Sequence, residues 1–507
     1  MSPLGILYMV TAFALSVYAL NTLILSLLFL RVRSHPKADA QLTGYPRITV
    51  QLPIFNEALV VDRLIEAAVR LDWPRERLQI QVLDDSTDET TAIVRRYVDH
   101  YRAQGVDIQL VHRTDRSGFK AGALVKGLRH ATGEFIAIFD ADFVPQADWL
   151  RRTIPHFLQR PQLGMLQTRW THLNHDYSLL TRAQAIALDG HFVVEQTARD
   201  RSGLLMNFNG TAGIWRRDCI ADSGGWQTDT ICEDLDLSYR AQLAGWDCMF
   251  LPEVATPAEV PPQLAAFKRQ QFRWAKGSVQ CLKKLAKPVA ASKYPLHVRI
   301  MGLVHLGAYL AHPLALLSLL IILPLMLSTR TPLVSLWFLS LLSVGPPLMY
   351  ALAQHHLYKG SWLRRYAHMP VLMLLGTGIA VSNTQAVFEA LFGISNVFQR
   401  TPKFRIEKQG DHWLGSQYSL PFNRIILAEL AVAGYAAATV AAAILTGHPQ
   451  AVPFLMLYVL GFSYVAFQGL WESRYDVLHS LRLLTHRKGE EASPSADYKT
   501  GPHPIYR

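Results

Sequence analysis

Two aspartates separated by one residue stand at the end of an apolar run, and this arrangement suits the binding of a hard divalent cation. The run 135–139 is rich in Ile and Phe and is followed directly by Asp140 and Asp142. Such a run predicts a strand buried on both faces, and ligands collect beyond the carboxyl ends of these strands. Two carboxylates there can hold one cation and leave coordination positions for substrate phosphates. Alone, the motif is weak evidence, because solvated turns also produce it.

Three further predicted strands, at 48–53, 78–83 and 108–111, also end in polar residues. Unrelated surface turns explain one or two such ends far better than four in succession, so we expect one shared binding site. Asp84 or Asp85 would accept hydrogen bonds from a base and ribose, and Lys120 would lie near phosphate. The residues at these strand ends are Pro53, Asn56, Glu57, Asp84, Asp85 and Lys120.

Two later motifs supply a candidate sugar-binding surface and a candidate base. Gly210 and Thr211 lie in the segment 208–213, which is small and flexible enough to let a sugar approach the backbone. Glu233 and Asp234 open a helical pattern, where acidic residues are favourable first-turn anions. One of these carboxylates could instead be a general base that activates an acceptor hydroxyl for attack on an anomeric carbon. Spacing alone favours the capping role.

The segment that must position these residues has the pattern of repeated βα units. From 46 to 264, short apolar runs alternate with polar helical stretches, which predicts a largely parallel sheet. Helices are expected at 59–71, 89–97 and 181–197, and another strand at 163–170. The expected fold class is α/β, Rossmann-like, joined to an α-helical membrane region.

Half of the 507 residues are hydrophobic, and they are unevenly distributed along the chain. The formal net charge of +11 comes from Lys and Arg beside apolar spans, which favours positive-inside topology over a nucleic-acid partner. Residues 4–30 can cross a bilayer and are followed by Arg31 and Arg33, which indicates an anchor whose C-terminal end is cytosolic. We expect a multi-pass protein of the inner or plasma membrane with a cytosolic catalytic domain.

About five spans are expected, at 4–30, 301–327, 333–353, 425–445 and 453–470. The apolar stretch 369–398 has basic residues at both ends, so we expect a re-entrant or interfacial helix pair within 366–408. Residues 265–285 are typical of a basic amphipathic helix on an anionic leaflet. The expected domains are an anchor at 1–32, a cytosolic domain at 46–264, interface helices at 265–298, a membrane region at 299–475 and a cytosolic tail at 476–507.

In order and spacing, these motifs resemble the membrane-integrated family-2 glycosyltransferases of the cellulose synthase and cellulose-synthase-like type, which include glucomannan and β-glucan synthases. The segments 79–88 and 208–213 are especially similar to the plant enzymes that make mannan and xyloglucan backbones. Gln270, Arg273 and Trp274 match the Gln-x-x-Arg-Trp pattern of processive β-glycan synthases and of ceramide glucosyltransferases. The other matching residues are Pro53, Asn56, Glu57, 83–88, 120–123, Asp140, Asp142, Glu233 and Asp234.

The resemblance implies a GT-A fold that binds a nucleotide-sugar donor together with Mg²⁺ or Mn²⁺. Asp140 and Asp142 would hold the metal diphosphate, and Asp234, beside Glu233, would be the base. A single base without a covalent nucleophile beside it favours one-step inverting displacement. The remaining donor-site residues would be Pro53, Asn56, Glu57, Asp84, Asp85 and Lys120.

On the acceptor side, the resemblance implies that Gln270, Arg273 and Trp274 contact the acceptor or the leaving diphosphate, with Gly210 and Thr211 beside them. A sugar ring could also stack on the Trp274 ring.

Segment 398–404 is similar to the gating loop of cellulose synthase, with Thr401 and Lys403 in matching places. The glycine that follows in that loop is replaced here by Phe404.

Three functions are considered. The first is processive synthesis of a β-glycan from UDP-glucose or GDP-mannose, and the likeness to plant β-mannan and β-glucan synthases favours it. The second is glycolipid synthesis on a membrane lipid, as in ceramide glucosyltransferases, for which the same donor site would serve. The third is a transporter or scaffold with an inactive nucleotide-binding domain, which would lack one of the carboxylate sets, and none is missing. The sequence identifies no partner subunit.

Overall fold

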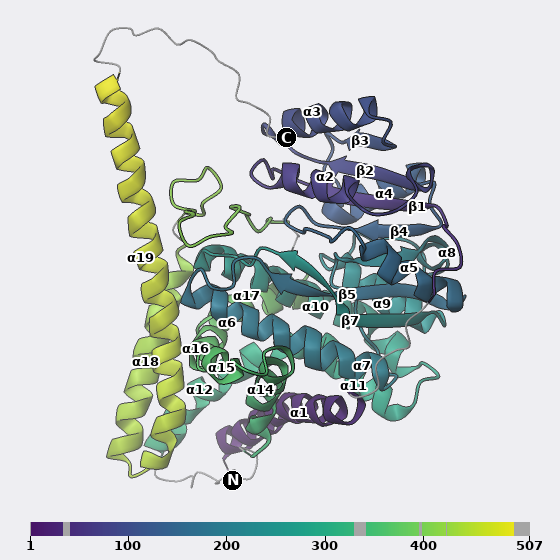
Figure 1. Cartoon of the computed structure of the whole chain (residues 1–507). Coiled ribbons are helices and arrows are strands. Elements are labelled where there is room, and N and C mark those ends of the chain that lie inside the picture. The colour runs from purple at the N-terminus through teal and green to yellow at the C-terminus, as the bar shows by residue number, and fades with distance from the viewer. Residues whose placement is uncertain (1, 34–40, 329–340, 395–397, 422, 491–507) are drawn as a thin grey trace.

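A seven-stranded sheet with the order β3-β2-β1-β4-β6-β5-β7 forms the centre of one half of the molecule (Figure 1). The computed structural model describes residues 2–33, 41–328, 341–394, 398–421 and 423–490. The strands are β1 (Ile48–Ile54), β2 (Leu78–Asp84), β3 (Ile108–His112), β4 (Phe135–Ile138), β5 (Leu163–His172), β6 (Gly213–Arg216) and β7 (Asp247–Ala258).

The sheet is mixed, whereas the sequence pattern predicts a largely parallel one. The first four strands are mutually parallel, and β5 is parallel to β7. The short strand β6 runs antiparallel to both β4 and β5 and joins the two parallel parts. The expected Rossmann-like α/β class is confirmed, and the four strands with polar ends all point the same way.

Helices cover both faces of the sheet, because each strand presents apolar side chains in both directions. On one face they are α2 (Val61–Val69), α3 (Thr90–Ala103) and α5 (Trp149–Gln159). On the other face they are α4 (Phe119–His130), α8 (Arg217–Asp222) and α9 (Glu233–Leu243).

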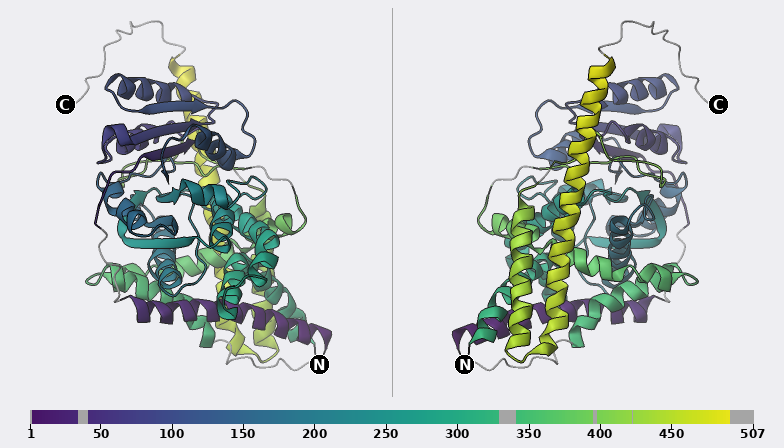
Figure 2. Two further views of the ribbon diagram at one scale, coloured as in Figure 1. Left: turned by 90° about the vertical axis from the view of Figure 1, so that its right-hand side faces the viewer. Right: turned by 90° about the vertical axis from the view of Figure 1, so that its left-hand side faces the viewer.

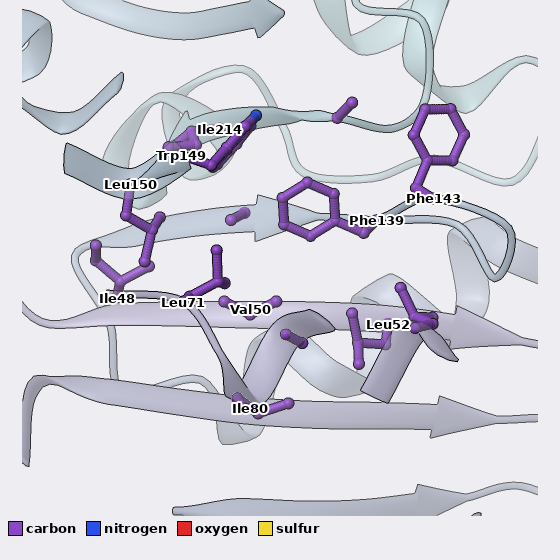
Figure 3. Close-up of a cluster of buried hydrophobic side chains, with 14 of the residues drawn as sticks. Ile48, Val50, Leu52, Leu71, Ile80, Phe139, Phe143, Trp149, Leu150 and Ile214 are labelled. Atoms are coloured by element: carbon purple, nitrogen blue, oxygen red, sulfur yellow. The ribbon is translucent and has the colours of Figure 1, made fainter. Parts of the chain in front are cut away.

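The strand β4 and the residue that follows it are completely buried, and Phe139 belongs to a large hydrophobic cluster (Figure 3). The rings of Phe139 and Trp149 meet edge to face at 4.7 Å, and both side chains are fully buried. The Trp149 indole N–H donates a hydrogen bond to Thr256 Oγ1 at 3.0 Å. Phe139 directly precedes Asp140, so this packing fixes the point at which the chain leaves the sheet.

The second half of the molecule consists of helices packed against the sheet domain. A long interface helix, α10, is followed by shorter apolar helices and by the hairpin of α18 and α19, which stands beside them (Figures 1 and 2). The helices are α1 (Pro3–Val32), α10 (Leu264–Ala290), α11 (Leu296–Leu306), α12 (Ala311–Leu327), α14 (Gly345–Leu357), α15 (Trp362–Tyr366), α16 (Met369–Gly378), α17 (Ala380–Leu391), α18 (Ile425–Leu445) and α19 (Val452–Glu490).

Within the described residues, four helices are long and apolar enough to cross a membrane, and a bent pair could make a fifth. The four are Pro3–Val32, Ala308–Leu327, Ile425–Leu445 and Pro449–Arg474, which correspond to four of the expected spans. The chain is therefore a multi-pass membrane protein by this criterion. Figure 2 shows that α1 lies crosswise to the α18–α19 hairpin, so these helices do not form one parallel bundle.

Two expectations for the membrane half, and one for the C-terminal tail, can be compared with the structure only in part. Of the expected span 333–353, residues 333–340 lie outside the described residues, and the following residues include the 13-residue helix α14. The stretch predicted as a re-entrant pair contains α16 and α17, which are bent by 43° at their junction. Of the expected tail, residues 491–507 also lie outside the described residues, whereas α19 continues to Glu490.

Replacing Phe139 by alanine should destabilise the sheet domain strongly. The substitution leaves a cavity against Trp149 in a core that cannot collapse easily, so we expect a loss of about 3–5 kcal/mol. The measurement is the melting temperature of the full chain in detergent, which should fall by several degrees. Leu179→Ala, at a position where 49% of the side chain is exposed, should leave the melting temperature nearly unchanged. Equal shifts in the two variants would contradict this account of the core.

Candidate active site

Most of the residues singled out in the sequence line one cleft at the carboxyl ends of β1, β2 and β4. The space between its walls, counted out into the open solvent at its mouth, is about 1280 Å³. Its wall includes Pro53, Glu57, Asp85, Lys120, Asp140, Asp142, Gly210, Glu233, Asp234, Gln270, Arg273, Trp274, Thr401 and Lys403. Side chains from β1 through to the segment that follows α17 therefore line the same cleft.

The side chain of Lys120 joins three segments of the cleft wall. Its Nζ donates hydrogen bonds to Asp140 Oδ1 at 2.5 Å and to the Gly210 carbonyl at 3.0 Å. The backbone N–H of Asp140 donates to Thr211 Oγ1 at 2.8 Å. The end of β4, the first turn of α4 and the 208–213 turn are thereby held together around one ammonium group.

Gly210 brings this ammonium group close to the carboxylate of Asp234. Its φ is +84°, a conformation that glycine adopts without strain. A Cβ at this position would lie 2.9 Å from Asp234 Oδ2 and 3.4 Å from Lys120 Nζ. A larger residue at position 210 would strain the backbone and would fill the space in front of Asp234. Because Gly210 and Asp234 both line the cleft, this space is accessible to a substrate.

Glu233 and Asp234 form the first turn of α9, where Glu233 is buried and Asp234 half-buried. Loss of solvent raises the pKa of Asp234, and the charge of Lys120 opposes this rise. Burial, followed by the charge of Asp234, raises the pKa of Glu233 to about 7. Carboxylates with raised pKa values are suited to accept a proton near neutral pH. The pair therefore begins a helix, as its spacing indicates, and also lies in the cleft.

Asp142 is engaged by a segment that arrives from the membrane half. Its side chain is almost fully buried, and its Oδ2 accepts hydrogen bonds from Lys403 Nζ at 2.8 Å and from the Glu259 backbone N–H at 3.2 Å. The Glu259 carboxylate accepts the backbone N–H groups of Phe404 and Arg405 at 3.0 and 2.9 Å. The segment 398–405 is thus held against the wall of the cleft that contains Asp142 and Glu259, by both backbone and side-chain contacts.

Glu259 is a cleft residue that the sequence analysis missed. It directly follows β7, a strand that the sequence analysis did not predict. Burial raises the pKa of Glu259 to about 7, and Lys403 opposes this rise. The available signal was a carboxylate followed by the apolar residues Val260 and Pro261, which is too common to identify a site.

A second contact of the same segment involves Arg400 and Glu57. Their side chains form an ion pair at 3.0 Å, and the Arg400 guanidinium also donates to the Phe55 carbonyl at 3.1 Å. Burial raises the pKa of Glu57 to about 8, and Arg400 and Lys403 oppose this rise. Arg400 is another cleft residue that the sequence analysis did not select.

One corner of the cleft combines a carboxylate with flat side chains. Asp85 Oδ1 accepts a hydrogen bond from Arg113 Nε at 2.7 Å. The Arg116 guanidinium lies 3.3 Å from the centroid of the Phe55 ring. The rings of Phe119 and Phe398 stack at 5.5 Å beside it. Flat groups of this kind can stack with a base, and a carboxylate can accept hydrogen bonds from a base or ribose.

Three sequence-selected residues do not appear in the cleft wall. Asp84 is fully buried and accepts three hydrogen bonds, one of them from the Ser86 backbone N–H at 2.9 Å. Asn56 Oδ1 accepts the Thr87 backbone N–H at 2.8 Å. Thr211 binds the Asp140 backbone as described above. The structure therefore makes Asp85 the member of the Asp84/Asp85 pair that faces the cleft.

A further side of the cleft, which we call the acceptor side because the motif resemblance predicts acceptor contacts there, is formed by α10 and the end of β5. Gln270, Arg273 and Trp274 lie on α10, in the amphipathic helix predicted for 265–285. Trp170 and His172 from the last residues of β5 also line the cleft, and the sequence analysis did not select them. Two tryptophans and several polar groups give this side the character of a sugar-binding surface.

A π-helical turn lies behind the acceptor side. Residues 181–197, predicted as one helix, divide into α6 (Leu179–Asp189), the π-helix η2 (Gly190–Gln196) and α7 (Thr197–Arg201). Within η2, His191 Nδ1 and Glu195 Oε2 are 2.9 Å apart. His191 Nε2 and Asn209 Nδ2 are also 2.9 Å apart, and Asn209 lines the cleft. A π-turn has no period in the sequence that distinguishes it from an α-helix.

Asp140 and Asp142 both line the cleft and carry oxygen ligands of the kind that suit a hard divalent cation. In this structure one oxygen of each carboxylate is bound by an ammonium group, Lys120 Nζ on Asp140 and Lys403 Nζ on Asp142, so a metal ion would use the remaining oxygens or displace these groups. No group of three or more His, Cys, Asp or Glu side chains arranged for a metal occurs among the described residues. A cage made by the protein alone is therefore not indicated in this part of the chain. Mg²⁺ is commonly bound by one or two carboxylates plus substrate phosphates, which matches two aspartates in a cleft.

Comparison with curated proteins finds close similarity over the sheet domain. Residues 46–277 match the model of glycosyltransferase-like family 2. Glucomannan 4-beta-mannosyltransferase 9 of Arabidopsis thaliana is 41% identical over 263 residues, which cover 51% of this chain and 49% of that protein. Probable glucomannan 4-beta-mannosyltransferase 7 of Oryza sativa subsp. japonica is 43% identical over 253 residues, covering 49% and 43%. The chain spans about half the length of these relatives.

Among solved structures, a mannosyltransferase of Pyrobaculum calidifontis in complex with GDP-Man and Mn²⁺ has a similar fold. The TM-score is 0.54 at 23% identity, and the alignment covers 76% of this chain and all of the other. The fold resemblance thus extends beyond the sheet domain. Residues 46–277 of this chain form a domain of glycosyltransferase-like family 2, and the family indicated by the motifs is confirmed.

Proposed function

We propose that the protein is an inverting membrane hexosyltransferase that extends a β-glycan from UDP-glucose or GDP-mannose. The observation that carries this proposal is the meeting of Lys120, Asp140 and Asp234 around Gly210 in one cleft. A carboxylate that can act as a base for the acceptor and a cation that can act on the leaving diphosphate are thereby close together in one cleft. The plant relatives, named as glucomannan 4-beta-mannosyltransferases, support mannose as a transferred sugar and a β-glycan as the product.

The donor would lie with its base at the Asp85 corner and its diphosphate near Lys120. Asp140 and Asp142 would hold Mg²⁺ or Mn²⁺, which when bound supplies positive charge next to the diphosphate. Lys120 and Arg273 offer further cationic groups that can stabilise the departing oxygens. No covalent enzyme intermediate is needed in this arrangement, because the proton acceptor and the diphosphate-binding groups act in one displacement.

The acceptor would lie between Asp234 and the α10 side of the cleft. Asp234 takes the proton of the attacking hydroxyl, and the Trp274 ring can support the acceptor sugar. Attack from the side opposite the diphosphate inverts the anomeric centre, so an α-linked donor gives a β-linkage. We propose the domain boundaries of the sequence analysis for the corresponding parts, with the sheet domain on the cytosolic side of the membrane.

Replacing Asp234 by asparagine should abolish transfer and preserve donor binding. Asparagine keeps the shape of the side chain and cannot accept the hydroxyl proton, so kcat should fall by at least about 100-fold. Turnover of GDP-mannose and UDP-glucose and the Kd of the matching nucleoside diphosphate should both be measured. Asp222→Asn, at an exposed aspartate of α8, serves as the control and should retain activity. Near-normal turnover of Asp234→Asn would contradict the assignment of the base.

The rate should rise with pH through an inflection near pH 7. Glu233, whose pKa is about 7, gains negative charge there and makes its neighbour Asp234 a stronger base. Below this pH both carboxylates become protonated in turn and the rate falls. In Glu233→Gln the inflection near pH 7 should be absent from the profile of kcat against pH. An unchanged profile in that variant would show that another group titrates there.

The nature of the product distinguishes a polymer from a glycolipid. Purified protein in nanodiscs is incubated with radiolabelled UDP-glucose or GDP-mannose, and the label is separated into polymer and lipid fractions. We expect a long product that a β-glycanase degrades. Label found only in a single-sugar lipid would replace polymer synthesis by glycolipid synthesis.

A further inference from the structure

A second cavity, which we call the α10 cavity, lies where the first half of α10 meets α17, the start of α18 and the middle of α19. The space between its walls, counted out into the open solvent, is about 1620 Å³. Ile231, Arg273 and Phe398 line both this cavity and the transfer cleft, so the two spaces adjoin. None of the roles assigned so far uses the α10 cavity.

The carboxylates of the α10 cavity are already engaged. Glu389 pairs with Lys276 at 2.8 Å. Glu472 accepts the backbone N–H of Leu264, at the N-terminus of α10, at 3.0 Å. Lys268, another lining residue, is paired with the buried Glu429 at 2.5 Å. Lys268 and Lys276 are therefore each paired with a carboxylate. The other cationic side chains of α10 that line the cavity belong to two arginines.

Arg269 and Arg273 line the α10 cavity without a carboxylate partner among the described residues. Arg273 donates to the Gln399 carbonyl at 3.4 Å and lies over the Phe398 ring. Partial burial, together with the charges of Arg400 and Arg273, lowers the pKa of Arg269. Guanidinium groups close together and short of anions are well suited to phosphate, which they bind through paired charge-assisted hydrogen bonds.

The surroundings of the α10 cavity are those of a membrane surface. The helices α18 and α19 are candidate spans, and α17 belongs to the bent apolar pair. Large apolar side chains are exposed on the same helices, with Phe388 and Phe392 on or just after α17, Leu427 on α18 and Phe467 on α19. In Figure 1 the α18–α19 hairpin stands beside α16 and α17. Acyl chains can therefore pack on the helices while a head group reaches the arginines.

We propose that the α10 cavity binds the phosphate group of a membrane lipid, with Arg269 as its main ligand and Arg273 shared with the transfer cleft. Basic pockets between membrane helices are known to take phosphorylated head groups. Since Arg273 also lines the transfer cleft, the lipid lies next to the acceptor side of the proposed transfer reaction. The binding itself does not depend on that reaction.

The test is a direct binding measurement on the full chain purified in a neutral detergent. Three probes are titrated by native mass spectrometry: dioctanoyl phosphatidic acid, dioctanoylglycerol and glycerol 3-phosphate. The first carries both chains and phosphate, the second only the chains and the third only the phosphate. We expect phosphatidic acid to bind at least about tenfold more tightly than either of the others, because both contacts are needed. This comparison requires no variant.

A pair of variants then locates the site. Arg269→Gln should weaken binding of dioctanoyl phosphatidic acid about tenfold, because charge-assisted hydrogen bonds are lost. Lys287→Gln, which removes an exposed positive charge elsewhere on α10, should bind as the unaltered protein does. The melting temperature of each variant shows that it is folded.

Three results would overturn the proposal. If dioctanoylglycerol binds as tightly as phosphatidic acid, the phosphate is not recognised. If glycerol 3-phosphate does so, the ligand is a free phosphate and not a lipid. If a folded Arg269→Gln protein retains full affinity, the lipid binds elsewhere. None of these binding measurements depends on sugar transfer. A failure of the lipid proposal would therefore leave the proposed transferase activity intact, and a failure of the proposed transferase activity would not change the lipid binding.

Discussion

The cleft depends on keeping several partly buried carboxylates close together without mutual repulsion. Lys120 achieves this for the central part, because its Nζ binds Asp140 Oδ1 and lies beside the point where Gly210 faces Asp234. One ammonium group thus serves two carboxylates that are proposed to act on different partners, the diphosphate and the acceptor. Burial raises the pKa of Asp234, and the charge of Lys120 opposes this rise. The basicity of Asp234, the proposed base, is therefore set by the balance between these two effects.

The position of Gly210 follows from the direction of a single short strand. Residues 208–212 immediately precede β6, and β6 runs antiparallel to β4. The turn before β6 therefore lies at the same edge of the sheet as the residues after β4. Ala212 N–H donates to the Ile138 carbonyl at 2.8 Å, and Thr211 receives the Asp140 N–H. A parallel strand in this place would have put the turn at the opposite edge, far from Asp140 and Lys120.

Sequence patterns identified the cleft residues that lie at the carboxyl ends of the parallel strands β1, β2 and β4. The ends of β1, β2 and β4 are marked by apolar runs that stop at carboxylates, so Asp85, Asp140 and Asp142 could be found directly. Two adjacent carboxylates after β2 could not be told apart, because only packing makes Asp84 fully buried. Glu259 and Arg400 were missed for a different reason. They become site residues through contacts with distant segments, and such contacts leave no local pattern.

The segment 398–405 connects the membrane half to the cleft by electrostatic contacts. It lies between α17 and α18, and it places Lys403 on Asp142 and Arg400 on Glu57. Asp142 Oδ2 is already occupied by the ammonium group, so a cation that binds this oxygen has to displace Lys403. If the proposed metal ion binds this oxygen, its binding and the release of Lys403 are linked equilibria, and each shifts the other by the same free energy. Because the segment is continuous with both helices, this linkage gives the membrane half a direct physical route to the chemistry of the cleft.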